Sequence, residues 1–134
     1  MSTVLGSTFS VVILYILGKV LGLTPDLFYA TLPKSVTTAI ALDIASKNGW
    51  QEALIPMMTV STGIIGAVIA PVVTKFMKSR VAKGLAMGTA SHAVGTAKAI
   101  EMGEVEGAMS GLALSLAAIS TSFIIPLLLT TILS

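Results

Sequence analysis

Two polar segments hold most of the side chains in this sequence that could bind a charged ligand. The first, residues 31–47, reads TLPKSVTTAIALDIASK, and the second, residues 84–101, reads GLAMGTASHAVGTAKAIE and carries the only histidine. Each combines a cation or an imidazole with closely spaced hydroxyl groups, and charged donors form the stronger hydrogen bonds to a carboxylate. We therefore predict that a small organic anion is bound by these side chains: Lys34, Ser35, Thr37, Thr38, Thr89, Ser91, His92 and Thr96.

The same residues also have purely structural interpretations. Lys34 could extend its ammonium to the membrane surface, and the hydroxyl groups could bond to carbonyls one helical turn back. His92 could take part in proton coupling, because histidine changes charge near neutral pH, or it could be a hydrogen-bonded structural residue. These alternatives stay open at the level of the sequence.

Three charged residues near the ends of the polar segments are candidates for coupling or gating: Asp43, Lys98 and Glu101. Asp43 lies four residues before Lys47, a spacing at which oppositely charged side chains pair on one helix. Lys98 and Glu101 could likewise form an exposed ion pair. A purely structural role is therefore the alternative for all three.

Enzyme chemistry is not indicated by any motif in the sequence. There is no glycine-rich phosphate loop, no nucleophile elbow and no H-E-x-x-H pattern. One histidine without a single cysteine does not make a zinc site, so we expect neither a metal nor a cofactor. The net charge of +2 comes from few charged residues rather than from a basic surface, and we expect no binding to nucleic acid.

The composition identifies a membrane protein. Of the 134 residues, 54% are hydrophobic and only 10% are charged, whereas soluble domains carry about 25% charged residues. Three segments are long and apolar enough to cross a bilayer as helices, which takes about 20 residues. They are residues 3–23, 53–73 and 107–133, and Pro126 is expected to kink the third or to end its regular part.

The two polar segments are expected to be helices buried among other helices, broken or re-entrant, because a lipid-facing helix would not accept their lysines, histidine and hydroxyls. If each were a continuous helix, the polar residues of 31–38 would share one face, and so would those of 89–96. Gly88, Ser91 or His92, Gly95 and Ala99 form a stripe of small residues that allows another backbone to come close. Both segments run from hydroxyls through small residues to a carboxylate, which is a loose internal repeat.

The number of crossings depends on whether the polar segments cross or re-enter. The connector 74–83 carries four basic residues and no acid, which places it in the cytoplasm. If every segment crosses, there are five spans, the N-terminus lies outside, and Lys19 lies on the side of the connector. The acidic run 101–106 then lies on the opposite side, with Glu104 and Glu106 solvated. The expected fold class is all-α, a polytopic helical membrane protein of about five spans with two broken or re-entrant polar segments, and re-entry of either segment would change this count. Residues 1–134 are expected to form a single transmembrane domain.

Two motifs resemble those of a known family. LPKSVTT, followed about fifty residues later by GLAMGTASHAVGTAKAIEMGEVEGAMS, is similar to the LrgB/CidB family of bacterial inner-membrane proteins, which is related to the plastidial glycolate/glycerate translocator. The resemblance covers about residues 5–130 and places the chain in the C-terminal portion of the longer family members, without their N-terminal helices. Ala39 stands where the family usually has a proline, so 34–46 is expected to run as a straighter helix.

The resemblance implies one of two functions at the bacterial inner (plasma) membrane. The first is transport of small monocarboxylates of the pyruvate or glycolate type, acting with a holin-like LrgA/CidA partner. The second is modulation of murein hydrolase activity and autolysis in programmed cell death, antiholin-like and without transport. The polar segments favour transport, since a lysine and hydroxyls in a low-dielectric cavity suit a carboxylate. The expected partners are membrane lipid, a small carboxylate, the holin-like protein and, as a further alternative, other copies of the chain.

Overall fold

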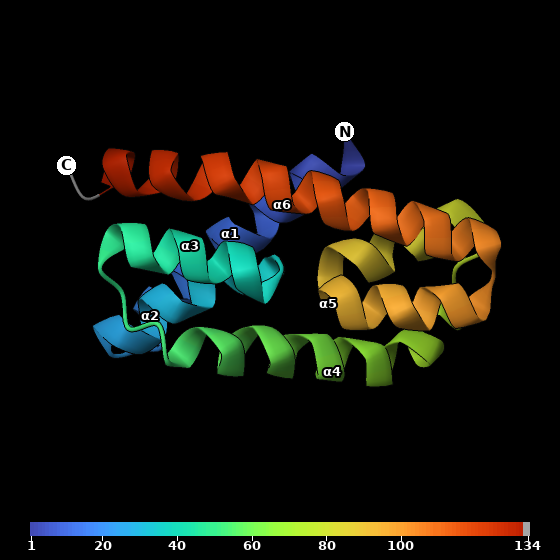
Figure 1. Ribbon diagram of the computed structural model, residues 1–134, viewed down its shortest axis with the longest axis horizontal. Helices are drawn as coiled ribbons and strands as arrows, with labels where there is room; N and C mark the ends of the chain where they lie inside the picture. The colour runs from blue at the N-terminus through green and yellow to red at the C-terminus, as the bar shows by residue number, and fades with distance from the viewer. Residues whose placement is uncertain (133–134) are drawn as a thin grey trace.

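All regular structure in the described part of the chain is helical. The computed structural model describes residues 1–132, without the side chains of Ser2, Ser35, Leu128, Leu129, Thr131 and Ile132. Its elements are α1 (Ser2–Val20), α2 (Pro25–Thr31), the 3-10 helix η1 (Leu32–Ser35), α3 (Thr38–Asn48), α4 (Leu54–Lys75), α5 (Arg80–Met102) and α6 (Glu104–Ile132). The expected all-helical fold class is confirmed (Figure 1).

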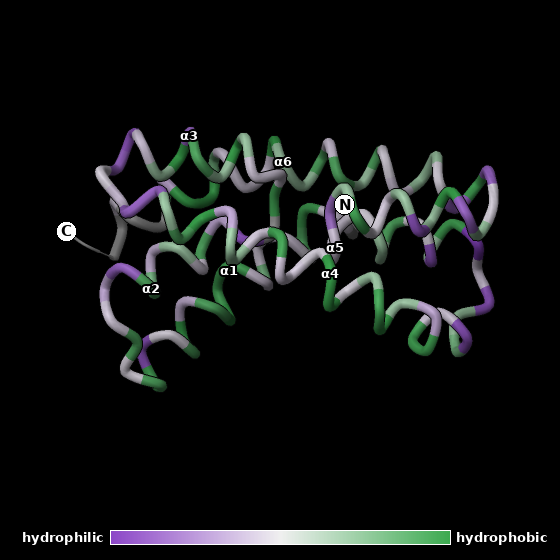
Figure 2. Tube along the Cα trace, turned by 60° about the horizontal axis from the view of Figure 1, so that its bottom comes forward, coloured by the Kyte–Doolittle hydropathy of each residue, from purple (hydrophilic) through white to green (hydrophobic). Residues whose placement is uncertain are grey.

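Three of these helices, α1, α4 and α6, are long and apolar enough to cross a bilayer, as the sequence predicts. With its 22 residues, α4 is about 33 Å long, close to the hydrocarbon thickness of about 30 Å. Hydrophobic residues dominate along these helices, and hydrophilic residues gather toward the two ends of the molecule (Figure 2). Pro126 does not end α6, which continues to Ile132.

The first polar segment is a helical hairpin, which we call hairpin 1 (residues 25–48: α2, η1 and α3). After η1 the backbone is extended at Val36 and Thr37, with ψ angles of 177° and 149°, so the helix is interrupted and α3 returns alongside α2. The rings of Tyr29 and Trp50 stack with their centroids 5.2 Å apart. In one straight helix these two residues would be about 30 Å apart.

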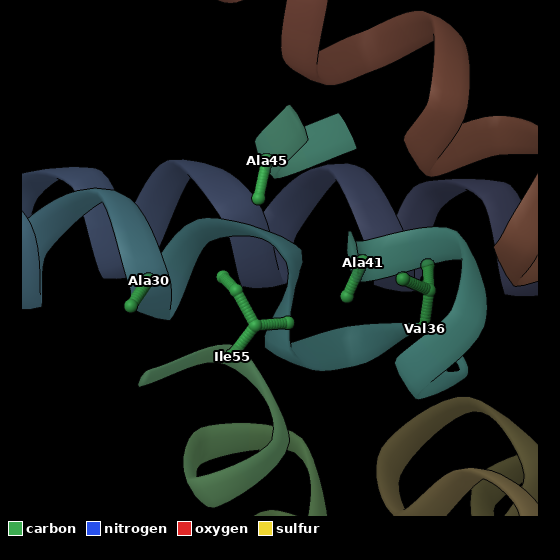
Figure 3. Packing of buried hydrophobic residues seen from close by; sticks show 5 residues of the cluster. All are labelled: Ala30, Val36, Ala41, Ala45 and Ile55. Carbon is green, nitrogen blue, oxygen red and sulfur yellow. The ribbon is translucent and has the colours of Figure 1, made fainter. Parts of the chain in front are cut away.

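A small core joins the two arms of hairpin 1 to α4. It contains one residue of α2, one of the turn, two of α3 and one of α4: Ala30, Val36, Ala41, Ala45 and Ile55 (Figure 3). All five are buried. The three alanines let the arms approach closely, and the larger Ile55 side chain fills the space between them and α4.

The second polar segment is also a hairpin, hairpin 2 (residues 80–102), formed by α5 with a sharp turn at His92. The backbone there has φ 50° and ψ −136°, which is not helical. Met87 and Ala99 pack together with Ala70 of α4, although twelve residues along a straight helix would separate them by about 18 Å. The two arms lie side by side in Figure 1.

Each polar segment turns back as a hairpin, so neither runs from one end of the molecule to the other. Arg80, at the start of α5, is ion-paired with Glu106, just beyond its end, at 3.0 and 3.1 Å. The acidic run 101–106 therefore lies at the same end of the molecule as the connector 74–83, and the arrangement that placed them on opposite sides is wrong. Lys19 lies at the other end, because Gly18 packs against Phe28 of hairpin 1; its expected place beside the connector is wrong as well.

The expectations that relied on continuous helices also fail. The shared polar face over 31–38 and the straight helix over 34–46 do not exist, because the chain is extended at Val36 and Thr37 and α3 begins only at Thr38. The turn at His92 interrupts the face expected over 89–96 in the same way.

The loose internal repeat has a counterpart in the fold. α1 followed by hairpin 1 forms one unit, and α4 followed by hairpin 2 forms the other. α1 ends beside hairpin 1, where Gly18 meets Phe28, and α4 begins there and runs away from it. The two units therefore run in opposite directions, and the hairpins enter the molecule from opposite ends (Figure 1).

Candidate functional site

The two hairpin tips meet near the middle of the molecule. α3 has 11 residues and is about 16 Å long, half the length of α4, so each hairpin reaches roughly half-way along the bundle. η1 at the first tip contacts α5, and the start of α3 faces the turn of hairpin 2 in Figure 1. The structure thus brings together residues from the two polar segments, more than fifty positions apart in the sequence.

His92 forms the tip of hairpin 2 and is almost completely enclosed. The residue is 4% exposed and its neighbour Ser91 is 2% exposed. A non-glycine residue with this combination of φ and ψ is strained by about 1–3 kcal/mol. Both ring nitrogens, Nδ1 and Nε2, are buried without a hydrogen-bond partner, so the imidazole offers unused hydrogen-bonding capacity at the tip.

Lys34 lies at the tip of hairpin 1, half-buried on η1. η1, which carries Lys34, contacts α5, which carries His92. Among the described residues, no carboxylate is ion-paired with Lys34; the recorded ion pairs involve other cations. The positive charge at this tip is therefore uncompensated by a side chain.

Two helical segments begin at the tips and add amide donors. α3 starts after Thr37, whose side chain does not cap it, and the second arm of hairpin 2 starts after His92. The first amide groups of a helix have no partner within it, and the helix dipole makes this end favourable for an anion. Both helix starts lie at the tips rather than at the ends of the molecule.

Three of the other predicted hydroxyls, those of Thr38, Thr89 and Thr96, form hydrogen bonds within the bundle. The Thr38 and Thr59 hydroxyls are 2.9 Å apart, which ties hairpin 1 to α4. Thr96 donates to the carbonyl of His92. Thr89 donates to the Leu85 carbonyl and packs against Gly6 of α1. The side chain of Ser35 lies outside the described residues.

Three polar residues of the long helices were missed by sequence reasoning. The buried Thr59 joins the Thr38 hydroxyl, and the buried Ser110 joins Thr96 at 2.9 Å. Thr121 is fully buried and its hydroxyl has no partner. Thr121 lies one helical turn before Ile125, which belongs to the same buried cluster as Leu32 of η1. Ser110 and Thr121 share one face of α6 by their spacing of eleven residues, a signal the sequence contains.

The candidate coupling and gating residues lie away from the tips in exposed ion pairs. Asp43 pairs with Lys47 at 2.7 Å, and Lys98 pairs with Glu101 at 2.6 Å. These are the simple pairs that the sequence left as the alternative.

The expectation of a solvated loop acid at Glu106 is wrong. Its side chain is only 6% exposed and it accepts two hydrogen bonds from Arg80. The pair closes the base of hairpin 2, where the two arms return to the same end of the molecule.

The chemistry of the tips suits an anion. A half-buried ammonium, a buried imidazole, hydroxyls and two helix starts supply donors and positive potential, and the carboxylates described above lie in pairs elsewhere. Among the described residues, no group of three His, Asp or Glu side chains could hold a metal ion.

Comparison with known proteins agrees with the motifs. Relatives include the antiholin-like protein LrgB of Bacillus mycoides, 40% identical over 126 residues that cover 92% of this chain and 55% of the relative. The holin-like protein CidB of Staphylococcus aureus strain Mu50 is 32% identical over 130 residues, covering 96% of this chain and 57% of the relative. The chain thus spans about half the length of these curated relatives. No solved structure matches. A family model described as LrgB-like matches residues 1–131, and the chain belongs to this LrgB-like family.

Proposed function

We propose that this chain moves a small organic monocarboxylate, such as glycolate or pyruvate, across the bacterial inner membrane, and that the hairpin tips bind it. The observation that carries the proposal is the buried, unpartnered imidazole of His92 beside the uncompensated Lys34. A carboxylate between the tips would accept hydrogen bonds from both groups.

The cost of the arrangement supports a ligand. A lysine near mid-membrane costs about 2.5–3.5 kcal/mol on insertion scales, and an unsatisfied buried polar group costs about 1–3 kcal/mol. The strained backbone of His92 adds to this cost. Such features are typical of functional sites, because structural stability alone would remove them.

Re-entrant hairpins whose inner ends meet at mid-depth also suit a transporter. Carriers with inverted repeats bind anions at the ends of broken helices near the bilayer midplane. In this proposal the basic connector 74–83 is cytoplasmic, the three long helices cross the membrane, and a holin-like LrgA/CidA protein acts with the chain.

The names of the relatives favour a second function. They are called antiholin-like or holin-like proteins, which fits a modulator of murein hydrolase activity and autolysis without transport of its own. A protein of this kind would not depend on the charge at the hairpin tips.

Uptake of labelled glycolate and pyruvate into vesicles that contain the chain separates the two functions. His92→Gly removes the imidazole and tolerates the positive φ, so hairpin 2 should still fold. Lys34→Met removes the charge, and Lys98→Met is the matched control in an exposed ion pair. We expect uptake to be lost in the first two variants and kept in the control.

Unchanged uptake in both tip variants would show that the binding site is misassigned. Absence of uptake in every variant, together with dye release from liposomes that carry the protein, would support a holin-like pore instead of a carrier.

A further inference from the structure

The two hairpins are sealed against α6 to very different degrees. In hairpin 2, Gly84 and Gly88 lie directly on the backbone of α6, where any side chain would overlap the carbonyls of Glu106 and Ser110. The Arg80–Glu106 pair closes the base of this contact.

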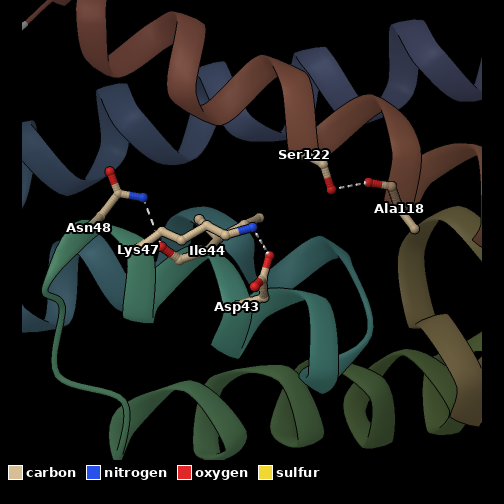
Figure 4. Close-up of polar contacts among 6 residues, drawn as sticks. All are labelled: Asp43, Ile44, Lys47, Asn48, Ala118 and Ser122. Carbon is tan, nitrogen blue, oxygen red and sulfur yellow. Dashed lines mark hydrogen bonds and ion pairs between the residues drawn. The ribbon is translucent and has the colours of Figure 1, made fainter.

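Hairpin 1 leaves a crevice against α6. Its volume is about 350 Å³, enough for a small organic acid. Figure 4 shows α3 and α6 on its two sides, with the Asp43–Lys47 pair reaching along one wall and Ser122 on the other. Asn48 lines it at the end of α3, and Ile44 and Pro126 complete the lining.

The lining indicates water rather than lipid. An acid, a base, an amide and a hydroxyl line the crevice, and charged groups in contact with acyl chains are strongly disfavoured. Ser122 donates its hydroxyl hydrogen to the Ala118 carbonyl of its own helix, so the Ser122 hydroxyl has its hydrogen-bond partner within α6. The polar side chains of the crevice walls are thus compatible with water inside the crevice.

The crevice lies along the outer half of α3, between the end of the molecule and the hairpin tip. Ser122 follows directly after Thr121, the buried residue with the unpartnered hydroxyl. α3 runs from Asn48, at the end of the molecule that contains Trp50, inward to Thr38 at the hairpin tip. A solute that moves along α3 through the crevice therefore approaches the tip of hairpin 1.

From this asymmetry we propose that the crevice between α3 and α6 is the entrance through which a small carboxylate reaches the hairpin tips, and that the chain in this conformation is open between hairpin 1 and α6 and closed between hairpin 2 and α6. The inference rests on the proposed function. With the connector 74–83 in the cytoplasm, the entrance faces the outside of the cell.

Cysteine labelling tests the entrance, and the chain suits it because it contains no native cysteine. Ser122→Cys places a thiol in the crevice. The matched control is Ser120→Cys, two residues earlier on the same helix and about 200° around its axis, which does not line the crevice. Both serines donate to a carbonyl four residues back, so each substitution replaces a hydroxyl that makes the same type of hydrogen bond.

Intact cells that express each variant are treated with a membrane-impermeant thiol reagent, and labelling and uptake of glycolate are then measured. We expect the reagent to label Ser122→Cys from outside and to reduce its uptake to the level of cells without the protein. Ser120→Cys should stay unlabelled and keep its uptake.

The labelling measurement tests the entrance and the uptake measurement tests the proposed function, so either one can fail without the other. If the unsubstituted chain takes up no carboxylate but Ser122→Cys is labelled from outside, the proposed function fails and the water-filled crevice remains. If uptake is normal but Ser122→Cys is labelled from outside no faster than Ser120→Cys, the entrance is refuted and the carrier function remains.

Discussion

Replacing Gly88 by alanine should destabilise the contact between hairpin 2 and α6. The new methyl group would overlap the backbone carbonyl of Ser110 and would lie 3.0 Å from the Cβ atom of Ala113. Overpacking costs about 1–3 kcal/mol, and the upper part of this range applies because a backbone carbonyl cannot rotate away. Alanine regains about 1 kcal/mol of helix propensity over glycine. The expected net loss in the free energy of unfolding is therefore about 2 kcal/mol.

Gly111 provides the control for this prediction. No atom lies within 4 Å of a methyl group added there, so Gly111→Ala should gain about 1 kcal/mol from helix propensity alone. Reversible unfolding in mixed micelles, followed by helical circular dichroism while the fraction of denaturing detergent rises, measures both variants. We expect a gap of about 3 kcal/mol between them; equal stabilities would refute the close backbone contact between hairpin 2 and α6.

The remaining predictions concern the polar contacts that hold the hairpins. Glu106→Gln should loosen the base of hairpin 2, because the buried carboxylate accepts both hydrogen bonds from Arg80. The rate of backbone amide hydrogen exchange should then rise over residues 80–102 and not in hairpin 1. An unchanged exchange pattern would argue against the ion pair. The Thr38–Thr59 hydrogen bond predicts a coupling energy of about 0.6 kcal/mol in a double-mutant cycle with valine at both positions, a typical value within membranes. A coupling energy of zero would mean that the bond does not form.

Much of the fold could be predicted from the sequence. The three long apolar stretches correspond to α1, α4 and α6, because each carries its own signal in length and composition. Polar residues in 31–47 and 84–101 were expected to be buried and broken for a local reason as well, since lipid does not accept them. The pairs Asp43–Lys47 and Lys98–Glu101 follow from helical spacing.

Residues that depend on distant partners could not be assigned in this way. Glu106 was expected in solvent, and only the approach of Arg80, 26 positions earlier, makes it a buried pair. The hydroxyl of Thr121 is unpartnered because of what surrounds α6, although Thr121 looks like an ordinary residue of an apolar helix.

The sequence by itself determined that this is a helical membrane protein of the LrgB-like family with two polar segments among apolar spans. Only the tertiary structure decided that these segments turn back at Val36–Thr37 and at His92. The physical reason is that the small-residue spacing of Gly88, Gly95 and Ala99 suits a straight helix packed on a neighbour as well as a hairpin packed on itself. The contacts with α4 and α6 favour the hairpin, and they join residues that the sequence keeps far apart.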